Sequence, residues 1–126
     1  MSATLVDASA VAAVLFDEPE AAPVLASVGQ TLLAPGLLRY EIASICSVKL
    51  QREPGLAKST LRRYRLFTGL AIEFDEPDWD TLPVLARQWQ LSAYDAAYLQ
   101  LALKHKAPLV TLDARLAAAY DRAAGR

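Results

Sequence analysis

The sequence contains only one cysteine and one histidine, Cys46 and His105, among its 126 residues. One cysteine excludes a disulfide within the chain, and these two residues alone cannot supply the four ligands of a structural zinc site. No apolar run is long enough to cross a membrane, and no basic segment precedes the apolar stretch at the N-terminus. We therefore expect a protein of the reducing cytoplasm with no membrane attachment.

The sequence also lacks a strong net charge. It has 13 basic and 14 acidic side chains, which give −1 when the histidine is neutral, so the total charge does not by itself indicate a nucleic-acid-binding protein. The charge is unevenly distributed, however. Residues 39–65 hold seven basic groups against two acidic ones, a local charge of +5 that leaves −6 for the remainder. Such asymmetry is typical of a phosphate-facing surface on an otherwise acidic protein.

Apolar residues are abundant, at 54% of the chain. The length suits a single domain over residues 1–126, with a core that needs no disulfide or structural metal. The high apolar fraction favours a layered α/β design or a subunit that also buries surface in an oligomer.

Short apolar runs alternate with helical patterns along the whole chain. Turn residues separate them, including Pro35-Gly36 and Pro54-Gly55, so that 37–67 is expected to form a helical hairpin. We expect strands at 4–6, 31–34, 70–74 and 108–112, and helices at 9–16, 18–27, 37–52, 56–67, 81–88, 92–104 and 114–122. This alternation predicts a parallel sheet flanked by helices on both faces.

Two acidic residues, Asp7 and Asp113, each follow an expected strand. The carboxyl ends of parallel strands share one edge of the sheet, where such folds bind ligands, so both side chains are expected there. Each has an alternative role as the N-cap of the next helix.

Two further acidic residues lie within expected helices. Asp95 is the third residue after Ser92, in a pattern that resembles a capping box. Glu41 interrupts an apolar helical face, where burying an unpaired carboxylate is costly, although a position facing the surface is the alternative. If all four acids meet at one edge, their mutual repulsion calls for a cation. Oxygen ligands without nearby histidine or cysteine favour Mg²⁺, or Mn²⁺ in its place.

Three segments make the sequence resemble the PIN-domain nucleases, and among them the VapC-type toxins of toxin–antitoxin pairs. They are LVDASA at residues 5–10, APGLLRYEIAS at 34–44, and LSAYDAAYLQLALKHKAPLVTLDARL at 91–116. The resemblance implies a PIN-like three-layer α/β/α fold with a protruding helical hairpin. It also implies a metal-dependent endoribonuclease that leaves 5′-phosphate and 3′-hydroxyl ends. Its catalytic and metal-binding residues would be Asp7, Glu41, Asp95 and Asp113.

The same resemblance assigns supporting roles to hydroxyl residues. Ser9 and Thr111 match positions that help to hold the acidic site, and Ser92 matches the small hydroxyl residue before the Tyr-Asp pair. Many family members have asparagine three residues after the middle glutamate, whereas this chain has Ser44. Serine can still donate a hydrogen bond, but over a shorter reach.

Three arginines are candidates for contact with RNA. Arg115 begins the helix after Asp113 and would contact a substrate phosphate or an acidic neighbour. Arg62 and Arg63 belong to a basic run with Tyr64 available for base stacking, and the alternative for that run is a solvated helix face. Glu18 would lie near the site or only begin a helix.

The expected function is a Mg²⁺-dependent endoribonuclease that acts as a toxin, hydrolysing RNA through metal-activated water. Its expected partners are the RNA substrate, a cognate antitoxin and a second copy of the chain. The alternatives are a PIN nuclease of RNA processing without an antitoxin, and an inactive domain that binds RNA or protein. His105 is expected to cap a helix C-terminus, Cys46 to lie in the core, and Trp79 and Trp89 to act as packing anchors or in a subunit contact.

Overall fold

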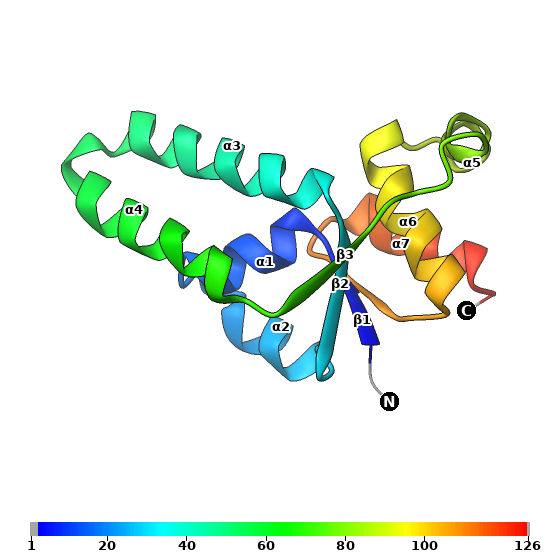
Figure 1. The fold of residues 1–126 in the computed structure, drawn as a ribbon, viewed down its shortest axis with the longest axis horizontal. Coiled ribbons are helices and arrows are strands. Elements are labelled where there is room, and N and C mark those ends of the chain that lie inside the picture. Colours follow the sequence, from blue (N-terminus) through cyan, green and yellow to red (C-terminus); the bar gives the residue numbers. More distant parts are fainter. Residues whose placement is uncertain (1–2, 126) are drawn as a thin grey trace.

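The computed structural model describes residues 3–125, whose centre is a four-stranded sheet with all strands parallel (Figure 1). The spatial order is β3-β2-β1-β4. The strands are β1 (Ala3–Val6), β2 (Thr31–Pro35), β3 (Ile72–Asp75) and β4 (Leu109–Val110). The α/β fold class with a central parallel sheet is therefore confirmed.

Seven α-helices within these residues connect and cover the strands. The third and fourth form an antiparallel hairpin that projects away from the sheet (Figure 1). The helices are α1 (Ala8–Leu15), α2 (Ala21–Ser27), α3 (Leu37–Arg52), α4 (Ala57–Arg65), α5 (Leu82–Trp89), α6 (Ala93–His105) and α7 (Ala114–Ala123).

Neighbouring residues of the central strands enter different cores. Leu5 and Leu33 pack with buried side chains of α5, α6 and α7, whereas Val6 and Ala34 pack with those of α1 and α3. Successive side chains of a strand point to opposite faces, so this division places helices on both faces of the sheet. The layered α/β/α arrangement follows from that apolar alternation.

The strand order reverses at β1. The chain proceeds from β1 to β2 and β3 on one side, and the last strand, β4, pairs with β1 on the other. In open parallel sheets such a switch point leaves a crevice beyond the carboxyl ends of the strands. Asp7 follows β1 directly and thus lies at this crevice.

Strand β4 is shorter than the predicted 108–112, because side chains take the backbone N–H groups that a longer strand would use. The N–H of Leu112 donates to Ser9 Oγ at 2.9 Å, and that of Asp113 donates to Thr111 Oγ1 at 3.0 Å. Residues 111–113 are therefore shaped by the site and leave the strand ladder.

Three other predicted boundaries were wrong by a few residues. The second helix begins at Ala21, after a turn that contains Asp17 with φ of 54°. A short 3₁₀ helix over Leu66–Gly69 follows α4, so β3 begins two residues later than predicted. Such turns depend on local hydrogen bonds, which apolar periodicity does not encode.

His105 has a different partner from the one predicted. It ends α6, but its Nε2 lies 2.9 Å from Asp75 Oδ2, the same oxygen that accepts a hydrogen bond from Lys104 Nζ at 2.9 Å. These two bonds are the main reason that the pKa of Asp75 is lowered to about 2. The cluster ties the end of β3 to the end of α6.

The other structural predictions for single residues had mixed outcomes. Cys46 is buried, as predicted, and Trp89 packs against the core with the Arg122 guanidinium 5.4 Å from its ring centre. Trp79, in contrast, is 66% exposed and anchors no packing within residues 3–125. None of the described helices is long and apolar enough to span a membrane.

Candidate active site

Asp7 is one of two polar residues buried in the core of residues 3–125, at 6% exposure. It caps α1 by accepting a hydrogen bond from the N–H of Ala10 at 3.0 Å. The same oxygen, Oδ1, accepts a bond from Ser9 Oγ at 2.7 Å, and Oδ2 accepts one from Thr111 Oγ1 at 2.5 Å. Asp7 can therefore be both the N-cap of α1 and a residue of the site, because Oδ1 accepts the cap hydrogen bond while Oδ2 faces Thr111.

Ser9 and Thr111 join the segments after β1 and β4. Their hydroxyl oxygens lie 3.4 Å apart, and each also accepts a backbone N–H from the loop that leads to α7. Asp113 then caps α7, where its Oδ1 accepts the N–H groups of Arg115 and Leu116 at 2.9 and 3.2 Å. The network fixes the position of Asp7 relative to Asp113.

Glu41 lies half-buried in the second turn of α3, beside the sheet. Its Oε1 accepts a hydrogen bond of 2.5 Å from the hydroxyl of Tyr98 on α6. The Tyr98 side chain is 1% exposed, and burial together with the Glu41 contact raises the pKa of its hydroxyl. Tyr98 therefore acts as a neutral donor that holds the Glu41 carboxylate.

Asp95 lies in the first turn of α6, but its carboxylate does not cap that helix. Ser92 is the cap, and its Oγ accepts the N–H of Asp95 at 3.1 Å. Within residues 3–125 the Asp95 carboxylate accepts no hydrogen bond. It is only partly exposed, so its charge is available to a ligand at this edge of the sheet.

The pKa values show that the acidic residues lie close enough to repel each other. Burial raises the pKa of Glu41, and the charges of Asp7 and Asp95 raise it further. Burial likewise raises the pKa of Asp95, with additional contributions from Asp113 and Asp7. The structure thus gathers four carboxylates from four separate segments, here called the acidic cluster: Asp7, Glu41, Asp95 and Asp113.

The donor chemistry of the acidic cluster fits a hard divalent cation. All its donors are carboxylate oxygens, and the raised pKa values of Glu41 and Asp95 show that the site disfavours uncompensated negative charge. Within the described part of the chain, no three acidic, histidine or cysteine side chains already converge on one point at metal-binding distance.

The candidate RNA-binding arginines are dispersed. Arg115 is exposed beside Asp95 and lowers its pKa, opposing the neighbouring acids. Arg63 lies 3.8 Å from Asp17, whereas Arg62 is exposed on α4. Arg115 therefore belongs to the site, and Arg62 and Arg63 belong to the hairpin.

A groove of about 410 Å³ adjoins the acidic cluster, between α3 and the turn after α1. Ser44 is exposed and lines this groove together with Ser9 and Glu18. Ser44 stands three residues after Glu41 on the same side of α3. Ser44, expected to support the site, and Glu18, expected near it or at a helix start, thus line the same groove.

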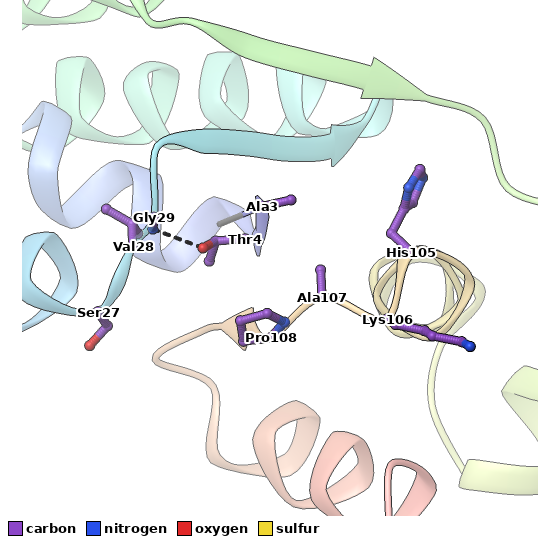
Figure 2. A pocket seen from close by; sticks show the side chains of 9 residues that line it. All are labelled: Ala3, Thr4, Ser27, Val28, Gly29, His105, Lys106, Ala107 and Pro108. Carbon is purple, nitrogen blue, oxygen red and sulfur yellow. Dashed lines mark hydrogen bonds between the residues drawn. The ribbon is translucent and has the colours of Figure 1, made fainter. Parts of the chain in front are cut away.

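A separate pocket of about 440 Å³ lies at the amino-end edge of the sheet (Figure 2). There the N–H of Gly29 donates a hydrogen bond of 2.9 Å to Thr4 Oγ1, the dashed line in Figure 2. Its ionisable lining residues are His105 and Lys106, with no carboxylate among them. This pocket therefore shares no lining residue with the acidic cluster.

Sequence analysis missed Tyr98 as a residue of the site. Its spacing from Asp95, three residues along one helix, was a usable signal because such residues share a face. An aromatic residue in an apolar helix is usually a core residue, and Tyr98 is that as well. Only its contact with Glu41, 57 residues away in sequence, shows the second role.

The fold and the acidic cluster define an α/β protein with a polyacidic site at the switch point of a parallel sheet. The sequence model of the PIN domain matches residues 4–122, so the chain belongs to the PIN domain family. PIN domains are generally metal-dependent nucleases.

A solved structure has a similar fold. The crystal structure of PAE2754 from Pyrobaculum aerophilum matches with a TM-score of 0.74 and 23% sequence identity, covering 94% of this chain and 86% of that chain. At this identity the likeness establishes the PIN-like fold alone. Among proteins with curated descriptions, none matches the sequence significantly.

Proposed function

We propose that this PIN domain is a Mg²⁺-dependent endoribonuclease, with Mn²⁺ as a substitute, and that it acts as the toxin of a toxin–antitoxin pair. The observation that carries the nuclease proposal is the acidic cluster, in which four chain segments bring carboxylates together at one edge of the sheet. Raised pKa values in such a crevice are typical of functional sites.

Three carboxylates, Asp7, Glu41 and Asp95, would hold the ion directly or through water, and Asp113 would hold a second ion or orient water. When bound, the ion lowers the pKa of a water molecule and offsets the charge of the attacked phosphate. Attack that expels the 3′ oxygen, as the resemblance to PIN-domain nucleases implies, would leave a 5′-phosphate and a 3′-hydroxyl.

The chain's own residues keep this site in place before RNA binds. Ser9 and Thr111 fix the two oxygens of Asp7, and Tyr98 fixes one oxygen of Glu41. Arg115, beside Asp95, would neutralise a phosphate oxygen of the substrate. Ser44 extends the polar surface from Glu41 into the groove.

The first test is cleavage of a mixed RNA pool by the purified protein. We expect cleavage with Mg²⁺ or Mn²⁺ and none after chelation, with activity restored by added metal. Adapter ligation that requires a 5′-phosphate, followed by sequencing, identifies the ends of the cleaved fragments. Cleavage that persists in excess chelator would contradict a metal-dependent mechanism.

The toxin assignment rests on the VapC-like sequence segments, and exposed apolar side chains on the hairpin support a protein partner. Leu56 is 53% exposed and Leu66 59% exposed. Such surfaces favour an antitoxin helix or a homodimer contact. Induced expression is expected to arrest growth, and the Asp95→Asn variant to permit it. Growth arrest by both the parent protein and Asp95→Asn would show that toxicity does not depend on nuclease activity. Light scattering of the purified protein measures whether it forms a homodimer.

Tyr98→Phe is expected to reduce RNA cleavage by about 10–100-fold, because the residue that orients a metal-binding carboxylate is lost. Half-maximal activity should require a higher Mg²⁺ concentration, while the KM for RNA stays within twofold. The fold should persist at a cost of about 1 kcal/mol in the free energy of unfolding.

Tyr120→Phe is the matched control for this prediction. Tyr120 is also buried, at 6% exposure, and its hydroxyl donates to the carbonyl of Ala107 at 3.1 Å, away from the acidic cluster. Its loss should cost similar stability without changing the metal requirement. An unchanged metal requirement in Tyr98→Phe would show that Tyr98 only packs.

A further inference from the structure

The groove beside the acidic cluster, here called the α3 groove, begins one hydrogen bond away from Asp7. Ser9 lines it, and Ser9 Oγ donates to Asp7 Oδ1 at 2.7 Å. The groove continues along α3 from Ser44 to Arg52. These positions span eight residues, or ~12 Å of helix. The α3 groove is therefore long enough to hold part of a ligand that extends beyond the acidic cluster.

One wall of the α3 groove carries cations and apolar surface. Lys49 and Arg52 lie in the last turns of α3, and Lys49 Nζ stands 5.0 Å from the ring centre of Phe16. Neither cation takes part in any ion pair within residues 3–125. Both complement the C-terminal helix dipole, but that interaction leaves their outward N–H groups free for an anion.

The opposite wall has the reverse charge. Glu18 and Glu20 line it, near the start of α2. Exposed apolar groups also line the groove, among them Val48 of α3 at 39% and Leu112 at 45% exposure. The α3 groove therefore combines anion-binding side chains, exposed apolar surface and hydrogen-bond-accepting carboxylates.

We infer that the α3 groove binds the single-stranded RNA segment next to the scissile phosphate, with backbone phosphates on Lys49 and Arg52. This inference rests on the proposed ribonuclease function. The bases would lie over Val48 and Leu112 and donate their exocyclic amino groups to Glu18 and Glu20, since carboxylates accept from such groups. A duplex keeps its bases paired and stacked and cannot present them this way, so the substrate is single-stranded.

The structure favours this surface over the basic run of α4 for RNA. Lys58, Arg62 and Arg65 line a different hollow, and none of the residues that line it is hydrogen-bonded to the acidic cluster. Arg63 is engaged with Asp17. The α3 groove, in contrast, combines two cations that form no ion pair within the described residues with a side chain, Ser9, that is hydrogen-bonded to Asp7.

The test compares short RNA of about three nucleotides with single-stranded RNA of about ten, using the double variant Lys49→Gln/Arg52→Gln. We expect the KM advantage of the long RNA to fall about tenfold. The dependence of log(1/KM) on log[salt] for the long RNA should become shallower by about 1.4, which is 0.7 for each lost phosphate contact. The control is Lys58→Gln/Arg65→Gln, which removes two exposed cations of α4 and should match the parent protein.

A second variant guards against misfolding of the first. Val48→Arg adds a cation at an exposed helical position of the α3 groove and should lower the KM of the long RNA. Parent protein that cuts no RNA with Mg²⁺ would refute the proposed function itself. If the parent protein is active but Lys49→Gln/Arg52→Gln keeps the lower KM for long RNA and its salt dependence, the α3 groove inference alone is overturned. It is also overturned if the double variant loses only the binding of a protein partner.

Discussion

Asp7→Asn is expected to lower metal-dependent RNA cleavage at least ~10³-fold, which corresponds to about 4 kcal/mol of lost transition-state stabilisation. The neutral amide removes one charge from the acidic cluster at its most buried position. Asparagine remains a good N-cap, so α1 should form as before. The free energy of unfolding without metal should fall by about 1–2 kcal/mol, because the amide nitrogen of asparagine cannot accept a hydrogen bond from Ser9 or Thr111 as both Asp7 oxygens do. Single-turnover cleavage at saturating Mg²⁺ and urea denaturation measure the two effects.

Asp17→Asn is the matched control, because it applies the same chemical change at the other end of α1. Its side chain is 75% exposed and faces Arg63, away from the acidic cluster. Asparagine tolerates the positive φ of 54° at this position. This variant should cut RNA at the parental rate. If Asp7→Asn and Asp17→Asn lose activity equally, the loss cannot be attributed to the acidic cluster.

Asp95→Asn is expected to abolish activity to a similar extent while making the metal-free protein more stable, by about 0.5 kcal/mol at pH 7. Burial and the charges of Asp113 and Asp7 outweigh the favourable Arg115 contact in setting the raised pKa of Asp95. The helix N-terminus favours an anion here, which limits the gain. A residue present only to stabilise α6 would show the opposite sign.

The stability gain should depend on pH in a defined direction. The pKa of Asp95 is raised in the folded protein from its ordinary value of 3.8, so ionisation costs folding free energy. The cost is absent below pH 3.8, where the carboxyl is protonated in both states, and it grows as pH rises through the folded-state pKa. Unfolding of the two proteins should therefore converge in acid and diverge toward neutral pH.

Asp121→Asn serves as the control for this comparison, since Asp121 is an exposed acid on α7 outside the acidic cluster. It should leave the pH profile of stability parallel to that of the parent protein. Saturating Mg²⁺ should then reverse the order of stability between the parent protein and Asp95→Asn, because only the intact cluster gains binding free energy. If the parent protein remains less stable than Asp95→Asn at saturating Mg²⁺, no bound ion compensates the negative charge of the acidic cluster.

Local sequence patterns determined the elements of the fold. Strand-forming runs at 4–6 and 31–34 and the helical periodicity of 37–52 correspond closely to β1, β2 and α3. They succeed because burial of alternate or one-sided apolar residues is a local property. The same patterns placed Asp7 and Asp113 at the ends of strands. Residues 111–112 were predicted to continue the last strand, but they leave it because the N–H of Leu112 donates to the distant Ser9.

Tertiary structure alone decided which distant groups meet. The strand order that brings β4 beside β1 allows Thr111 to bond Asp7 across 104 residues, and the packing of α6 lets Tyr98 reach Glu41. It likewise turned His105 toward Asp75 and left Lys49 and Arg52, along the α3 groove, without an ion pair to any residue from 3 to 125. Sequence periodicity reports which side of an element is buried, but not which element covers it. The sequence therefore determined which acids are candidates, and the fold determined their hydrogen-bond partners, the raised pKa values of Glu41 and Asp95, and the α3 groove that we propose as the RNA-binding surface.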